Sequence, residues 1–306
     1  MFRLLAPLLL LSAVSLHSAL AFTPVVSIMS HPHNSTHEFI ASSYVKYLEA
    51  GGARAMRIPF NANVTTIDTI VKNTNGILFM GGEPSLPPTA SYMYGTILAQ
   101  YDLQDPMTMI PMWGTCLGFE WIAQCHAGLS VLSSGFDAEN ITLPLTFTAD
   151  AISSRMYTSS PTDLLTLLAN NNVTMNNHEG GVTPVEFEAT MADEFTLLST
   201  NVDRQGMEFV SSYEHRMYPI YGTQYHPEKS MFEYGAQADP ADLGYEVIDH
   251  SPEGTRYSFE LASFLVAEAR KTGARFDRAS GLKTIMEEND GFGAGTSFEQ
   301  YIFFKV

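Results

Sequence analysis

Short apolar runs alternate with longer segments of helical spacing along the first half of the chain. The short runs are bounded by glycine or proline, which is typical of buried strands. The longer segments carry apolar residues at helical spacing, and one of them stops at a pair of glycines, which indicates helices. Strands are predicted at residues 24–29, 53–58, 76–80 and 109–113, and helices at 39–50, 66–72, 86–103 and from 118 through 124.

The second half of the chain has a different pattern. Residues 129–210 are predicted to form short, β-rich pieces, and the polar, glycine-rich tract 287–296 is predicted to be a flexible surface loop. A further strand is predicted at 218–225, a long helix at 257–271 and an apolar end at 301–304. Strands separated by helices predict an α/β fold with a doubly wound, mostly parallel sheet flanked by helices. Since no linker or repeat divides them, residues 22–306 are predicted to be a single domain.

Composition narrows the class of protein. Of the 306 residues, 45% are hydrophobic and 16% are charged, which is ordinary for a globular protein. The net charge is −17, from 16 basic and 33 acidic residues. This excess of acid disfavours binding to nucleic-acid phosphates or to anionic lipid. We therefore expect no nucleic-acid partner.

The first 21 residues resemble a secretory signal peptide. Arg3 precedes a short apolar run, and Ala19-Leu20-Ala21 is an A-x-A cleavage site. The alternative is a buried N-terminal helix. No apolar run reaches the ~18 residues of a membrane span, so none is expected. Four N-x-[ST] sequons agree with secretion and predict glycosylated surface turns. They begin at Asn34, Asn63, Asn140 and Asn172.

The chain has two cysteines, Cys116 and Cys125. If both lie on one helix, a rise of 1.5 Å per residue separates them by roughly 13 Å. A disulfide needs Cα atoms within about 7 Å, so the two should not be bridged. Cys125 is predicted to be a buried helix residue. A free thiol in an oxidising compartment needs a reason, and the surroundings of Cys116 supply one.

Cys116 lies in Gly-Thr-Cys-Leu-Gly (114–118), between a predicted strand and a predicted helix. A G-x-nucleophile-x-G turn at this position is the sharp elbow that exposes a nucleophile. Its glycines allow a strained turn and a close backbone approach. The helix N-terminus is expected to lower the pKa of the thiol. The alternative is a buried structural cysteine.

His226 and Glu228 follow the predicted strand at 218–225. If that strand is parallel to the one before Cys116, His226 lies at the same sheet edge. Its imidazole could then take the thiol proton and donate it to a leaving amine. Glu228, two residues further on, would point to the same side and orient the ring. The alternative is a surface His-Pro-Glu turn.

Gly81-Gly82 ends the predicted strand at 76–80. The backbone N–H of Gly82, together with that of Leu117, could form an oxyanion hole, whereas the alternative is a plain turn. The histidines His31, His33 and His37 are predicted to lie in a polar loop beside Asn34. Their spacing does not match a metal-ligand pattern, and no metal is expected.

Three strings carry a resemblance to a known family: Gly-Thr-Cys-Leu-Gly-Phe-Glu (114–120), Tyr-Gly-Thr-Gln-Tyr-His-Pro-Glu-Lys (221–229) and Ser-Phe-Glu-Gln-Tyr-Ile-Phe (297–303). In order and spacing they resemble the gamma-glutamyl hydrolases, folate-polyglutamate peptidases of the class I glutamine amidotransferase-like superfamily. The resemblance covers nearly all of the chain after residue 21. It implies Cys116 as nucleophile, His226 as acid and base, and Glu228 as the supporting carboxylate.

The resemblance implies two substrate-binding residues as well. Glu120 lies one helical turn after Cys116, where it would hold a substrate α-amino group; the alternative is a structural i,i+4 role. His178 resembles a histidine near the family's substrate cleft, although Gly180-Gly181 departs from the family pattern.

The function implied is that of a cysteine-type omega peptidase. It would cleave γ-glutamyl bonds of folylpoly-γ-glutamates through a Cys-bound acyl-enzyme, without a cofactor, on a small-molecule substrate and as a homodimer. The signal peptide implies the secretory pathway, with the extracellular medium or a lysosome or vacuole as destination. The alternatives are a glutamine amidotransferase or glutaminase-type hydrolase, and a non-catalytic secreted γ-glutamyl-binding glycoprotein.

Overall fold

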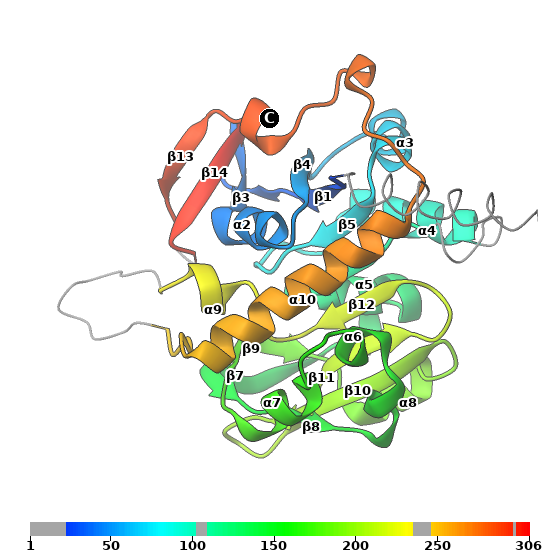
Figure 1. Ribbon diagram of the computed structural model, residues 1–306. Helices are drawn as coiled ribbons and strands as arrows, with labels where there is room; N and C mark the ends of the chain where they lie inside the picture. Colours follow the sequence, from blue (N-terminus) through cyan, green and yellow to red (C-terminus); the bar gives the residue numbers. More distant parts are fainter. Residues whose placement is uncertain (1–22, 102–108, 235–245, 296–297) are drawn as a thin grey trace, which may run out of the picture.

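The computed structural model describes residues 23–101, 109–234, 246–295 and 298–306, so the predicted signal peptide lies outside the described residues. At its centre is an eight-stranded sheet in the order β4-β1-β5-β6-β12-β11-β10-β8 (Figure 1). Its strands are β1 (Val25–Met29), β4 (Arg54–Ile58), β5 (Gly76–Phe79), β6 (Met112–Thr115), β8 (Thr146–Phe147), β10 (Phe195–Val202), β11 (Glu208–His215) and β12 (Ile220–Thr223).

The strands from β4 to β12 in this order are parallel to one another. The strands β11, β10 and β8 continue the sheet in antiparallel fashion. Only residues 203–207 join β10 to β11, and parallel strands need a much longer crossover. The predicted doubly wound, mostly parallel fold is therefore confirmed, with an antiparallel extension at one edge.

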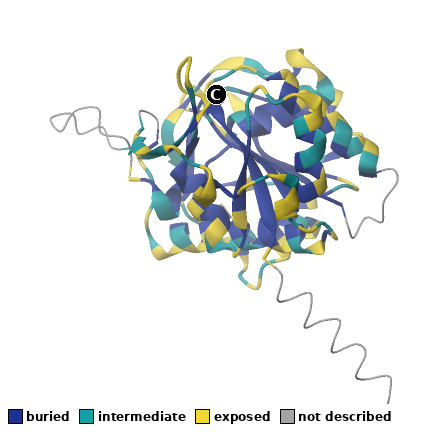
Figure 2. Ribbon diagram, turned by 90° about the horizontal axis from the view of Figure 1, so that it is seen from above, coloured by how far each residue is buried: buried dark blue, intermediate teal, exposed yellow. Residues whose placement is uncertain are grey.

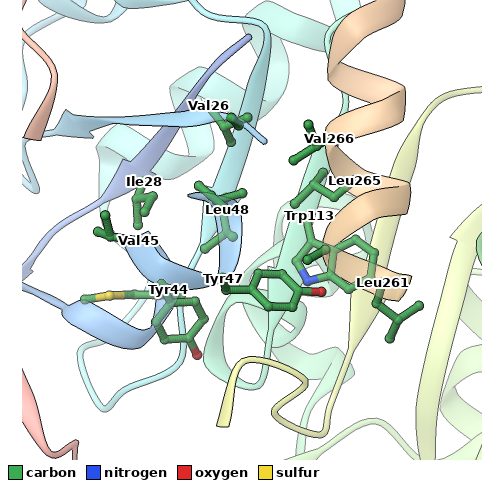
Figure 3. Packing of buried hydrophobic residues seen from close by; sticks show 14 of the residues in the cluster. Val26, Ile28, Tyr44, Val45, Tyr47, Leu48, Trp113, Leu261, Leu265 and Val266 are labelled. Atoms are coloured by element: carbon green, nitrogen blue, oxygen red, sulfur yellow. The ribbon is translucent and has the colours of Figure 1, made fainter. Parts of the chain in front are cut away.

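Helices cover both faces of the parallel strands, and a hydrophobic core lies under each layer. One face carries α2 (Ser42–Ala50) and α10 (Pro252–Lys271), and the other carries α3 (Val64–Asn73), α4 (Pro88–Tyr101) and α5 (Leu117–Ala127). Figure 3 shows Leu261 and Leu265 of α10 beside Trp113 of β6. The strands between the layers are almost wholly buried (Figure 2).

The long helix α10 has the end signals that its sequence predicts, and it begins five residues before the predicted start at 257. The Ser251 hydroxyl accepts a hydrogen bond from the N–H of Gly254 and Pro252 follows it, which together start a helix. Arg270 and Lys271 in the last turn complement the negative end of the helix dipole.

Two smaller sheets complete the fold. One has the order β13-β14-β3-β2 and the other pairs β7 with β9. Their strands are β2 (His31–Pro32), β3 (His37–Ala41), β7 (Ser133–Leu143), β9 (Thr174–Gly181), β13 (Gly291–Ala294) and β14 (Gln300–Lys305). The short helices are α6 (Arg155–Thr158), α7 (Leu164–Asn170), α8 (Pro184–Thr190), α9 (Lys229–Phe232) and the 3-10 turns η2 (Leu129–Val131), η3 (Ala149–Ser153), η4 (Arg278–Ser280) and η5 (Ile285–Glu287).

Two element predictions are wrong because the segments pair with distant strands, and a third is incomplete. The predicted helix at 39–50 begins only at Ser42, because Phe39 pairs with Phe303 across β3 and β14. Part of the predicted loop 287–296 is strand β13, which pairs with β14. The region 129–210 has the short strands that were predicted, but it also holds helices α6, α7 and α8. Local periodicity does not register such long-range contacts.

His31 does not lie in a polar loop as predicted. It is fully buried in β2, and its ring lies 5.3 Å from that of Trp121 and 6.1 Å from that of Phe39. Neither ring nitrogen has a hydrogen-bond partner among the described residues. Burial lowers the pKa of His31 to about 3, so the ring stays neutral in the folded protein.

This neutral histidine should make the protein less stable in acid. Below pH 6.5 the unfolded chain protonates His31 and the folded chain does not, so unfolding is favoured until the pH falls to about 3. Between pH 7 and 5 the cost is about 2 kcal/mol. We expect the free energy of unfolding of His31→Leu to fall by about 2 kcal/mol less than that of the wild type between pH 7 and pH 5. Urea unfolding at both pH values measures the difference. An unchanged pH dependence would contradict the assignment.

Three of the four sequon asparagines are exposed, as predicted for surface turns. Asn34, Asn63 and Asn172 are exposed. Asn140 is half-buried in β7 at a left-handed φ of 49°, and its side-chain oxygen accepts a hydrogen bond from the N–H of Val247. Among the described residues, no helix is long and apolar enough to cross a membrane.

Both cysteines are free, as predicted from their spacing. Cys116 is the N-cap of α5 and Cys125 lies within that helix. Cys125 is half-buried rather than buried.

Candidate active site

Three loops meet at the carboxyl ends of neighbouring parallel strands. Gly81-Gly82 follows β5, Cys116 follows β6 and His226 follows β12. The strands are in direct register, since Gly114 pairs with Phe79 on one side and with Gly222 on the other. The carboxyl edge of a parallel sheet is the usual position of a site in this fold class.

Cys116 occupies a strained turn between β6 and α5. Its φ of 51° and ψ of −109° are unusual for a residue with a side chain, and its N–H donates to the Thr223 carbonyl at 2.8 Å. The two flanking glycines leave no room for a Cβ atom. One placed on Gly118 would lie 2.0 Å from the Phe79 carbonyl oxygen, and one on Gly114 would lie 2.4 Å from the Gly118 carbonyl oxygen. The turn therefore has the geometry of a nucleophile elbow.

The pKa of the Cys116 thiol is raised, not lowered as expected from its position at a helix N-terminus. Burial is the largest cause, and the carboxylates of Glu120 and Glu228 add to it. The N–H of Leu117 and the ammonium of Lys229 act in the opposite direction but do not outweigh burial. The thiol is thus protonated in the free protein, and a base is needed to take its proton.

His226 and Glu228 form a buried pair beside this thiol. The Nδ1 atom of His226 lies 2.8 Å from Oε1 of Glu228 and 3.4 Å from the Tyr44 hydroxyl. Nε2 is then the ring nitrogen that can exchange a proton with Cys116. Gly81 lies between the side chains of His226 and Cys116 and is in close contact with both. A Cβ atom on Gly81 would lie 2.7 Å from Cε1 of His226 and 3.3 Å from Cβ of Cys116.

The thiol of Cys116 is hydrogen-bonded to Asn177 rather than to His226. Its Sγ atom donates to the carbonyl oxygen of Asn177 at 3.9 Å. No hydrogen bond joins the sulfur to His226 in the described structure, so the two groups must come closer for proton transfer. Such loose geometry is common in unliganded sites and does not argue against the pair.

The two residues predicted for the oxyanion hole both line the cavity above Cys116. The backbone N–H of Leu117 lowers the pKa of the thiol, although burial outweighs it. Gly82 has a φ of +154°, and a Cβ atom there would lie 2.5 Å from Nδ1 of His31. The backbone can adopt this conformation against His31 because residue 82 is glycine.

The cavity has a volume of about 450 Å³ and is open on one side. It contains all seven residues predicted for catalysis and binding except Glu228, which lies behind His226. Its wall is acidic. The acidic side chains on the wall are Glu83, Glu120, Glu139 and Glu179.

Glu120 is buried in the cavity wall, in the first turn of α5. Burial raises its pKa to about 7, and a hydrogen bond from Nε2 of Gln224 at 3.1 Å opposes the rise. Near neutral pH the carboxyl is therefore poised between a donor and an anion. It would accept a substrate ammonium group in its ionised form.

His178 lies across the cavity on β9. Its Nδ1 atom donates to the Gly180 carbonyl at 2.7 Å, which leaves Nε2 as an acceptor. That atom is buried and has no partner among the described residues. Burial lowers the pKa of His178 to about 4, so the ring is neutral. A neutral acceptor at this position suits a substrate N–H group.

Sequence reasoning missed several residues of the site. Lys229 lies on the cavity wall, and it follows Glu228 directly in a string already singled out. Tyr44 and Asn177 contact His226 and Cys116, and Phe298 lines the cavity from the C-terminal segment. Phe298 belongs to the string 297–303 already singled out, and Asn177 directly precedes His178. Tyr44 lies in a segment remote in sequence, and no local pattern marks it.

Comparison with known proteins agrees with this geometry. Residues 37–238 match the family described as Glutamine amidotransferase class-I, which defines the class of the fold and site. The chain is 33% identical over 288 residues to Gamma-glutamyl hydrolase B of Dictyostelium discoideum. This match covers 90% of this chain and 81% of that protein. It is 34% identical over 293 residues to Gamma-glutamyl hydrolase of Homo sapiens (89% and 87%), and 30% identical over 265 residues to Gamma-glutamyl hydrolase 1 of Arabidopsis thaliana (83% and 74%). The chain belongs to the gamma-glutamyl hydrolase family of enzymes.

Proposed function

We propose that this protein hydrolyses γ-glutamyl bonds, with folylpoly-γ-glutamates as substrates, through an acyl-enzyme on Cys116. The observation that carries the proposal is the position of Cys116 in a strained elbow beside the buried His226–Glu228 pair. The names of the similar proteins supply the bond that is cleaved.

The reaction follows from these positions. Sγ of Cys116 attacks the γ-carbonyl carbon while its proton passes to Nε2 of His226, since burial keeps the thiol protonated beforehand. The N–H groups of Gly82 and Leu117 stabilise the oxyanion. The C–N bond then breaks, and His226 gives its proton to the leaving amine. In the second half a water molecule attacks the thioester while His226 takes its proton. The C–S bond then breaks, the acid product leaves, and His226 returns the proton to the sulfur to restore the thiol.

Glu120 and His178 are proposed to bind substrate on opposite sides of the nucleophile. A Glu120 carboxylate that holds an α-amino group should discriminate between a free and an acylated amine. We expect Glu120→Gln to raise KM about tenfold for a γ-glutamyl peptide with a free α-amino group, since it loses a charge-assisted hydrogen bond. The KM for the same peptide N-acetylated should change much less. Equal changes would favour the structural role of Glu120.

Passage through the secretory pathway is proposed from the signal-like residues 1–21 and the four sequons. Destination in the medium or in a lysosome or vacuole, and assembly as a homodimer, are proposed from the family. Exposure of Asn34, Asn63 and Asn172 supports glycosylation at these sites. Glycosidase treatment of the secreted protein, followed by mass spectrometry of each sequon, tests the glycans, and sedimentation tests the dimer.

The deciding experiment is incubation of the purified protein with a pteroyl-poly-γ-glutamate, beside a Cys116→Ala control, with products identified by mass spectrometry. Shortened chains from the wild type alone would support the proposal, and their lengths would distinguish removal of single glutamates from internal cleavage. Intact substrate with both proteins would reject it for this substrate. Glutamine and other γ-glutamyl amides would then test the glutaminase alternative, and retention of ligand without cleavage would favour a binding protein.

A further inference from the structure

A buried ion pair lies on the wall of the catalytic cavity. Lys229 is the first residue of α9 and is 1% exposed, and its Nζ atom lies 2.5 Å and 2.6 Å from the two carboxylate oxygens of Glu246. The ring of Phe298 lies 5.2 Å from the same ammonium. With a carboxylate on one side and an aromatic face on another, Lys229 has little capacity left for a second anion.

Glu246 is held on Lys229 by contacts of its own segment. The side-chain amide of Asn177 donates to Oε1 of Glu246 at 3.5 Å. The next residue, Val247, donates its N–H to Oδ1 of Asn140 at 2.6 Å, and its carbonyl accepts from the Thr142 hydroxyl. The backbone carbonyl of Asn177 accepts the hydrogen bond of the Cys116 thiol, so Asn177 contacts both Glu246 and the nucleophile.

The charge of the cavity makes this pair important. The described residues on its wall include several glutamates, and among them Lys229 is the only lysine or arginine. A γ-glutamyl chain carries a free carboxylate on each residue. An anionic substrate therefore finds one cation in the cavity, and Glu246 already neutralises it.

We propose that Glu246 is a specificity-determining residue that occupies, on Lys229, the place of a substrate carboxylate. A carboxylate-bearing substrate must displace Glu246 from Lys229, whereas an uncharged substrate need not. Glu246 thus weakens the binding of anionic chains relative to neutral γ-glutamyl amides. This inference rests on the proposed function, because it takes a γ-glutamyl chain as the ligand.

The test compares two ligands that differ only in charge: γ-glutamyl-glutamate, and the same peptide with every carboxylate converted to a carboxamide. In Glu246→Gln the KM for the carboxylate peptide should fall about tenfold, while the KM for the amidated peptide should stay within twofold of the wild type. A fall for both peptides, a rise for both, or no change for either would overturn the proposal. Thermal unfolding checks that the variant is folded.

Glu139→Gln is the matched control. Glu139 lies on the same wall, and no hydrogen bond or ion pair joins it to Lys229 in the described structure. Its removal lowers the negative charge of the cavity by the same amount. If both variants lower the KM for the carboxylate peptide equally, general repulsion explains the effect and the specific role of Glu246 is rejected.

A binding measurement separates this proposal from the proposed function. Calorimetry with the same two peptides on Cys116→Ala and on Cys116→Ala/Glu246→Gln needs no turnover. We expect about tenfold tighter binding of the carboxylate peptide to the double variant and no difference for the amidated peptide. This result would stand even if neither peptide is cleaved by the wild type, in which case only the hydrolase proposal fails. Equal affinities of the two proteins for the carboxylate peptide would reject the role of Glu246.

Discussion

Replacement of His226 by alanine is expected to lower kcat/KM for a γ-glutamyl substrate by about 10³-fold or more. The reason lies in the state of the thiol. Since burial and two carboxylates raise the pKa of Cys116, few molecules carry a thiolate before substrate binds, and the proton must leave during attack. Without the imidazole, neither the thiol nor the leaving amine has a partner for proton transfer. Steady-state kinetics at several pH values measures the loss.

His33→Ala is the matched control for this variant. His33 is exposed and lies outside the catalytic cavity, so kcat/KM of the His33→Ala variant should stay within twofold of the wild type. Circular dichroism should show that both variants are folded. A His226→Ala enzyme that keeps a tenth or more of the wild-type kcat/KM would exclude His226 as the essential acid and base.

The second large effect concerns stability rather than chemistry. Gly118→Ala is expected to lower the free energy of unfolding by about 3 kcal/mol or to prevent folding. The added Cβ atom would lie 2.0 Å from the carbonyl oxygen of Phe79 and 2.6 Å from its carbonyl carbon. These are backbone atoms of the neighbouring strand β5, so they cannot turn aside as a side chain would. Urea unfolding of the purified variant measures the effect.

Gly95→Ala provides the comparison within the same fold. Gly95 is exposed on helix α4, and a Cβ atom there would meet nothing within 4 Å. Because alanine favours a helix by about 1 kcal/mol over glycine, this variant should be as stable as the wild type or more so. If Gly118→Ala were as stable as the wild type, the close contact between Gly118 and the Phe79 backbone of β5 would be contradicted.

Both effects trace to the edge where β5, β6 and β12 end. In the elbow at Cys116, Gly118 lies against Phe79 of β5, and the N–H of Cys116 donates to Thr223 at the end of β12. This close packing holds the nucleophile, the paired glycines and the imidazole around one cavity. Strain at Cys116 is supported by the surrounding sheet, as is common for residues in rare backbone conformations.

The amino-acid sequence by itself determined the parallel strands and the elements that carry the candidate site. The apolar runs before Gly81 and Gly114 are continuous because these strands are buried on both faces, so their pattern is strong. The glycines around Cys116 mark its turn for a similar reason, since no larger residue fits. Local signals of this kind are visible wherever one residue's own environment restricts its type.

Tertiary structure alone decided the electrostatics and the partners. The burial of His31 and the raised pKa of the Cys116 thiol depend on segments far apart in the chain. The pair between Lys229 and Glu246 joins residues 17 apart that no local pattern connects. The pKa of a thiol reflects everything that removes water from it, and a helix N-terminus is only one contribution. Phe39 likewise belongs to a strand because it pairs with Phe303, which lies near the other end of the chain.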